Sequence, residues 1–168
     1  IFSYAQTFAD GAVKNEPWLA ACCGRDASCR ASFARTRLSV LQGLPENDAT
    51  AHYDSVSREI RISEGRLLNC MTPECVESVL THELGHACHH AIRGAEFGTL
   101  YVKGCNAPEV TEAVQADLRS RLGQEATSCI EASLRAELGS GGEGCLNHWL
   151  FEAFANGVFL GSLDRPLH

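Results

Sequence analysis

The sequence lacks several features that define common functional classes. It has no excess of basic residues: 21 acidic residues outnumber 14 lysines and arginines, for a net charge of −7, which argues against a nucleic-acid or anionic-membrane binder. It has no apolar run near the length of a membrane span. It has no CxxC pair, so a zinc ribbon or thioredoxin-like motif is not supported. Without repeats or a linker, residues 1–168 are expected to form a single domain.

Cysteine, by contrast, is abundant. Nine cysteines in 168 residues are unusual for a reducing cytosol and predict a secreted or otherwise extracytoplasmic protein with disulfides. We expect at least three intrachain bridges, one of them between Cys70 and Cys75, and an odd thiol left over. The alternative is that the cysteines are reduced and buried as small apolar residues. Because the chain opens at Ile1 without Met, we interpret it as a mature or trimmed form, with any signal or inhibitory pro-segment outside it.

The residue pattern predicts an α+β fold that is mainly helical. Helices are expected over 3–15, 28–43, 73–93, 108–122, 125–138 and 148–160. Thr72 is expected to cap the third of these and Asn147 the last. Residues 51–64 differ, because "EIRIS" alternates apolar and polar positions and predicts a strand or hairpin. We expect Glu59–Ser63 to be an edge strand that could bind substrate backbone by strand addition.

The stretch "HELGH" is the strongest chemical signal in the chain. It places His82 and His86 four residues apart on one face of a helix, where two imidazoles can hold one Zn²⁺. Glu83 lies about 100° around the helix, so it would reach a water on the metal rather than the metal itself. Gly85 would let another backbone pack close beneath the site. The alternative is a His-rich helix face exposed to solvent.

A catalytic zinc also needs a third protein ligand. The H-E-x-x-H-x-x-G-x-x-H pattern fails because position 92 is Ile, and His89 and His90 lie too far around or along the helix to share the ion. Glu152 is the better candidate, since it is the only acidic residue in "HWLFEAFANGVFL", where burial would require pairing or metal binding. The alternative places it on an exposed helix edge. Asn156, one turn on, could hydrogen-bond a ligand and fix its orientation.

Peptide hydrolysis further requires a donor that stabilises the oxyanion. His148 is one turn before Glu152 on the same helical face and is our candidate for this catalytic role. Tyr53 and Tyr101 are alternatives, and for each of the three the other interpretation is an ordinary packed or solvent-facing residue.

"HELGH" followed downstream by "FEAFANGVF" resembles the gluzincin metallopeptidases. The E-x-x-A-N spacing within the second segment is similar to that of HtpX-like and ImmA/IrrE-like peptidases. The resemblance implies a zincin-like fold, with an active-site helix, a small sheet with an edge strand, and a C-terminal helix that carries the third ligand. It implies His82, His86 and Glu152 as zinc ligands and Glu83 as general base and acid. HtpX-like enzymes have membrane helices and ImmA/IrrE-like enzymes are intracellular, so no subfamily is assigned.

These features together predict a secreted zinc-dependent endopeptidase that hydrolyses peptide bonds in proteins or peptides with a metal-activated water. The alternative is a non-catalytic binding or structural protein with a vestigial or stabilising zinc site. Glu83 favours the enzyme, because a purely structural site has no use for that carboxylate.

Overall fold

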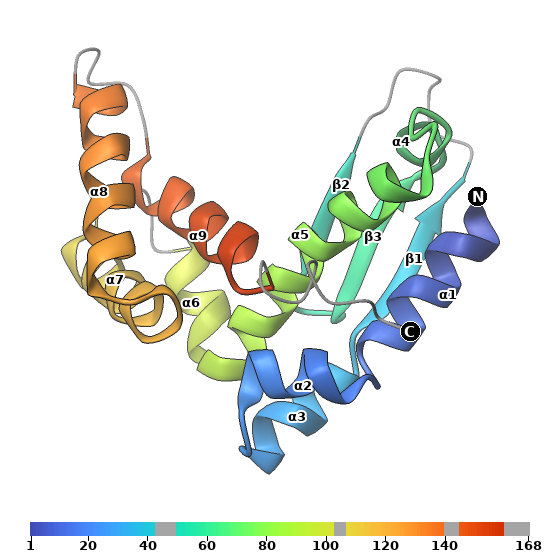
Figure 1. Ribbon diagram of the computed structural model, residues 1–168, viewed down its shortest axis with the longest axis horizontal. Coiled ribbons are helices and arrows are strands. Elements are labelled where there is room, and N and C mark those ends of the chain that lie inside the picture. Colours follow the sequence, from blue (N-terminus) through green and yellow to red (C-terminus); the bar gives the residue numbers. More distant parts are fainter. Residues whose placement is uncertain (43–49, 103–106, 140–144, 160–168) are drawn as a thin grey trace.

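The computed structural model describes residues 1–42, 50–102, 107–139 and 145–159, and it is mainly helical with one small sheet (Figure 1). The elements of the N-terminal half are α1 (Phe2–Ala12), α2 (Glu16–Cys23), α3 (Ala27–Ala34), β1 (Arg37–Leu41), β2 (Ala51–Asp54), β3 (Glu59–Ser63) and α4 (Glu64–Leu68). Those that follow are α5 (Pro73–Arg93), α6 (Glu96–Val102), α7 (Pro108–Leu122), α8 (Gln124–Gly139) and α9 (Leu146–Gly157). The predicted α+β, mainly helical class is confirmed.

The sheet has the order β1-β3-β2, with β3 parallel to β1 and antiparallel to β2. Ile60 and Ile62 of β3 are completely buried, as expected for alternating apolar positions on the core face of a sheet. The hairpin predicted over 51–64 is confirmed. The prediction that Glu59–Ser63 is an edge strand is wrong, because β1 and β2 pair with its two sides. The edge strand that lies against α5 is β2.

The prediction of one helix over 28–43 is wrong in its second half. Helix α3 ends at Ala34, and β1 follows from Arg37. Leu38 and Val40 of this strand pair with Ile60 and Ile62 of β3. The apolar alternation in "RLSVL" is therefore satisfied by a sheet partner distant in sequence, which overrides the local helical preference.

Helix α5 runs through the middle of the molecule, with the sheet and α1 on one side and α7, α8 and α9 on the other (Figure 1). The helix predicted over 73–93 is confirmed, with the Thr72 hydroxyl accepting from the Cys75 N–H at 3.2 Å and Gly94 ending the helix at φ 65°. A Cβ added to Gly85 would lie 2.6 Å from Cα of Ala155 in α9, so Gly85 does allow a second backbone to pack close. The close approach fixes α9 against α5.

The N-terminus of α9 differs from the prediction. Cys145 is the N-cap and its sulfur accepts from the backbone N–H of His148 at 3.3 Å. Asn147 is instead buried, and its side chain bonds the carbonyl of Ala107 and the hydroxyl of Thr111. Asn147 therefore ties α9 to the start of α7 rather than capping its own helix.

Six of the described cysteines form three disulfides, which confirms the expectation of at least three. Cys22–Cys88 links α2 to α5, Cys23–Cys29 links α2 to α3, and the predicted Cys70–Cys75 bridge closes the segment leading into α5. Cys145 is also disulfide-bonded, whereas Cys129 is an exposed free thiol. Across the described segments, none of the helices combines the length and apolar character that a membrane span requires.

Candidate metal and catalytic site

The structure brings together the three side chains predicted to bind metal. His82 and His86 project from one face of α5, with their rings 4.9 Å apart, and α9 brings Glu152 to them. Nε2 of His82 lies 2.6 Å from Oε2 of Glu152, and Nε2 of His86 lies 3.2 Å from its Oε1. One donor atom from each residue falls within 4.8 Å of the others. Two imidazoles and a carboxylate are a donor set that suits zinc.

The hydrogen bonds of His82 test whether this set fits a cation. Its Nδ1–H donates to Oδ1 of Asn156 at 2.6 Å, which leaves the Nε2 lone pair aimed at Glu152. A lone pair and a carboxylate oxygen at 2.6 Å repel each other unless a proton or metal ion lies between them. The Glu152 contact is accordingly the main reason that the pKa of His82 is raised. The residues present therefore fit a divalent metal, with Asn156 in the orienting position predicted for it.

Glu152 is held in its charged form by these neighbours. Burial opposes ionisation, but the close imidazoles of His82 and His86 outweigh it and keep the pKa of Glu152 well below its usual value. Its side chain is 22% exposed, so it is not the solvent-facing residue of the alternative interpretation.

Glu83 lies beside the ligand set but outside it. The residue is only 6% exposed, and burial is the main reason that its pKa rises to about 7. The backbone of Tyr53 in β2 has a smaller, opposing effect and lowers this pKa. A carboxyl group whose pKa is near neutrality suits a role in which it accepts and returns a proton.

These groups share one cavity, which we call the cleft, with a volume of about 400 Å³. It is lined by Ala51, His52, Tyr53, Ser55, His82, Glu83, His86, Phe97, His148 and Glu152. The sequence predicted that His148 could reach the site, and it does form part of the wall. The contribution of Ala51, His52 and Ser55 was missed, because the adjacent strand was assigned to residues 59–63.

The two alternatives to His148 differ in what the structure shows of them. The Tyr53 hydroxyl and Nδ1 of His90 share a hydrogen bond of 2.7 Å, and burial raises the pKa of Tyr53 to about 12 and lowers that of His90. The Tyr53 hydroxyl is therefore already hydrogen-bonded within the protein. The side chain of Tyr101 lies outside the described residues.

His89 and His90 are both buried and neither belongs to the metal cluster formed by described residues. Nε2–H of His89 donates to Oδ2 of Asp117 in α7 at 2.7 Å, and Arg93 bonds both oxygens of the same carboxylate. Burial lowers the pKa of His89. It opposes ionisation of Asp117 too, but the hydrogen bonds from His89 and Arg93 outweigh it there and keep the pKa of Asp117 low. Asp117 therefore ties α5 to α7 through these two residues.

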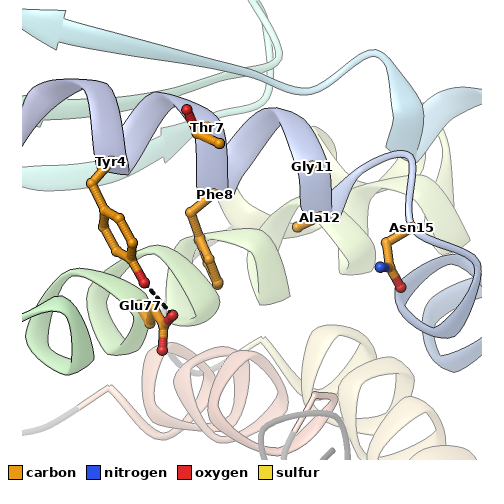
Figure 2. Close-up of a pocket in the computed structure, with 7 residues that line it drawn as sticks. All are labelled: Tyr4, Thr7, Phe8, Gly11, Ala12, Asn15 and Glu77. Carbon is orange, nitrogen blue, oxygen red and sulfur yellow. Dashed lines mark hydrogen bonds between the residues drawn. The ribbon is translucent and has the colours of Figure 1, made fainter. Parts of the chain in front are cut away.

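A separate cavity of about 310 Å³ lies between α1 and α5 and shares no described lining residue with the cleft (Figure 2). Tyr4 and Phe8 point from α1 toward α5, and the Tyr4 hydroxyl donates to Glu77 at 2.5 Å. The described lining residues include one carboxylate and neither imidazole nor thiol. They do not form a metal donor set, so the chemistry considered below is that of the cleft.

Four residues carry the chemistry expected from the sequence: His82, Glu83 and His86 on one helix and Glu152 on a later one. In this structure both helices carry those residues into a common cleft beside an edge strand. Comparisons with protein-family models, with curated proteins and with solved structures find no match to this chain.

Proposed function

We propose that the chain is a zinc-dependent endopeptidase of gluzincin type that hydrolyses peptide bonds in proteins or peptides. One observation carries the proposal: His82, His86 and Glu152 converge within 4.8 Å in the same cleft as the buried carboxylate of Glu83. A structural zinc site has its coordination closed by four protein ligands, whereas a catalytic one keeps a position open. Three ligands with an adjacent carboxylate fit the catalytic kind.

Each residue then has a distinct role. Zinc, when bound, would polarise the scissile carbonyl and lower the pKa of water. His82, His86 and Glu152 would hold the ion, and Asn156 orients His82 through its Nδ1–H. Glu83 takes a proton from the attacking water and returns it to the leaving amine.

The remaining groups of the cleft would act on the substrate. His148 donates a hydrogen bond to the carbonyl oxygen as it becomes negative. The outer edge of β2 would offer backbone groups to an extended peptide, since β3 is the partner of β2 among the described strands. The substrate would then lie across the mouth of the cleft.

We also propose that the protein works outside the reducing cytosol. This second proposal is supported by the three disulfides among the described residues. One of them, Cys22–Cys88, is buried in the core and attaches to the helix that carries the histidines. Disulfides persist in oxidising compartments and are rare in the cytosol.

The test contrasts two substitutions. Glu83→Gln preserves the size of the side chain but removes the base, so hydrolysis of a denatured protein should fall about 10³-fold while zinc content stays at that of the wild type. His82→Ala should lose zinc and activity together. Zinc is measured by elemental analysis after gel filtration, and a chelator control identifies hydrolysis that depends on the metal.

Two results would contradict the proposal. If zinc-loaded Glu83→Gln protein cleaves at an undiminished rate, the activity does not come from this cleft. If zinc-loaded wild-type protein cleaves nothing across a broad panel of proteins, the non-catalytic binding or structural role becomes the better account of the metal site.

A further inference from the structure

A second cavity of about 340 Å³, which we call the Arg66 lobe, adjoins the cleft at Glu83. It is lined by Ala51, Arg66, Ser78, Val79, His82, Glu83 and Asn156. Ala51, His82 and Glu83 also line the cleft, so the two cavities meet at the proposed reaction centre. A peptide that crosses Glu83 would place one side of its scissile bond toward each cavity.

The position of Arg66 is set by local structure. Helix α4 follows β3 directly, and the Ser63 hydroxyl caps it by accepting from the backbone N–H of Arg66 at 3.1 Å. The side chain is half-buried on the wall of the lobe. A capped helix turn thus holds the base of a long cationic side chain beside the reaction centre.

The charge of Arg66 is available to a ligand. Arg61, on the adjacent strand β3, is neutralised by Asp54 at 2.9 Å and by Glu59 at 3.4 Å. Among the described residues, no ion pair or side-chain hydrogen bond engages the guanidinium of Arg66. Guanidinium groups bind carboxylates in a two-pronged geometry that combines charge with directed hydrogen bonds. An acidic group entering this lobe would find a cation with its donors free.

We propose that Arg66 determines specificity by binding a substrate carboxylate close to the scissile bond. The inference rests on the proposed function and deepens it: the preferred substrates are peptides with an acidic side chain, or a free C-terminal carboxylate, in the Arg66 lobe. The chain as a whole carries a net charge of −7 and repels acidic peptides at long range, but physiological salt screens that repulsion beyond about 8 Å. Contact with Arg66 therefore decides the preference.

Binding is measured first, so that the result does not depend on catalysis. The protein is the full chain in zinc-containing buffer with Glu83→Gln, which prevents cleavage, and the probes are short alanine-based peptides with an uncharged fluorophore. One set carries Glu at successive positions and an amidated C-terminus. A second set carries Gln at those positions with a free C-terminal carboxylate, and an amidated Gln set is the reference. The first two sets separate side-chain from terminal carboxylates.

At least one carboxylate probe should bind about tenfold more tightly than its Gln reference, as one charge-assisted hydrogen-bond pair would give. Arg66→Gln should abolish that advantage, and Arg66→Glu should shift the preference to a matched Lys probe. Arg119→Gln removes an equal charge from an exposed site on α7 and should leave the advantage intact. A carboxylate bound by the metal alone would not show the reversal with Arg66→Glu. Unfolding midpoints confirm that each variant is folded.

Cleavage is measured separately, with Glu83 intact. The mapped cleavage sites of a denatured protein should lie close to acidic residues or to the chain end, and Arg66→Gln should erase that bias. Equal binding of the carboxylate and Gln probes, or an advantage that persists in Arg66→Gln, overturns the inference even if the protein is a peptidase. A third outcome separates the two proposals. If the protein cleaves nothing but still prefers carboxylate probes, and Arg66→Gln loses that preference, carboxylate binding by Arg66 is upheld and the proposed function is refuted.

Discussion

Gly85→Ala is expected to push α9 away from α5 and so to separate the proposed metal ligands. The new Cβ would lie 2.6 Å from Cα and 2.7 Å from the carbonyl carbon of Ala155, whereas carbon atoms in contact prefer about 3.5–4.0 Å. The obstacle is backbone, which cannot rotate away as a side chain does. The helix must therefore retreat by about 1 Å, and Glu152 and Asn156 would move with it.

The effect on stability should be small because two terms oppose each other. Alanine favours the helix by about 1 kcal/mol relative to glycine, while overpacking of a close contact costs about 1–3 kcal/mol. The free energy of unfolding should therefore fall by about 0–2 kcal/mol. The effect on function should be larger, since a misplacement of about 1 Å in a catalytic group can reduce rates about 10²-fold.

The assay compares Gly85→Ala with Gly11→Ala. Gly11 is also helical, in α1, but a Cβ there would meet nothing within 4 Å, so this control should be stabilised by about 1 kcal/mol with unchanged zinc affinity. Urea unfolding, zinc competition with a chelator and hydrolysis of a denatured protein are measured on both. If Gly85→Ala gains stability like the control and keeps its zinc affinity, the close approach of the two helices is refuted.

Two further predictions concern groups that support the site. Asn156→Ala should weaken zinc binding by about 10- to 100-fold, because His82 loses the partner of its Nδ1–H. Competition with a chelator measures the zinc affinity. An unchanged affinity would show that this hydrogen bond does not contribute to zinc binding. Asp117→Asn should lower the free energy of unfolding by about 3 kcal/mol at neutral pH, because His89 and Arg93 lose their charged partner. The fold lowers the pKa of Asp117. The wild-type protein should therefore keep its full extra free energy of unfolding at pH values above about 3.9, the ordinary pKa of an aspartate, and lose it as the pH falls through the lowered pKa. Urea unfolding at several pH values measures this, and a difference that stays constant into strong acid would contradict it.

The features that sequence alone predicted well are local ones. The two ends of α5 are marked by residues at the ends themselves: Thr72 and Pro73 at the start and Gly94 at the end. Helical geometry then places His82 and His86 on one face. Glu152 was identified because a lone carboxylate in an apolar helix needs a partner. Its two imidazole contacts are the kind of partner that this argument requires.

The features that sequence missed depend on distant contacts. Whether β2 or β3 lies at the edge of the sheet depends on where β1 pairs, and the segment of β1 looked like the end of a helix. Nothing in "AHYD" marks it as the strand that lines the cleft. Arg66 gave no signal either, because a single arginine in a short polar segment is ordinary on any surface.

The residues after "HELGH" have a use that a search for metal ligands overlooks. Cys88, His89 and His90 point in successive directions around α5, about 100° apart, and each is fastened to a different element. Cys88 is disulfide-bonded to α2, His89 is hydrogen-bonded to α7, and His90 is hydrogen-bonded to β2. A helix held on three sides just beyond its ligands cannot rotate or slide without breaking one of these bonds. The helix face that carries His82 and His86 is thereby fixed in advance, and such preorganisation is what the proposed catalytic role would require.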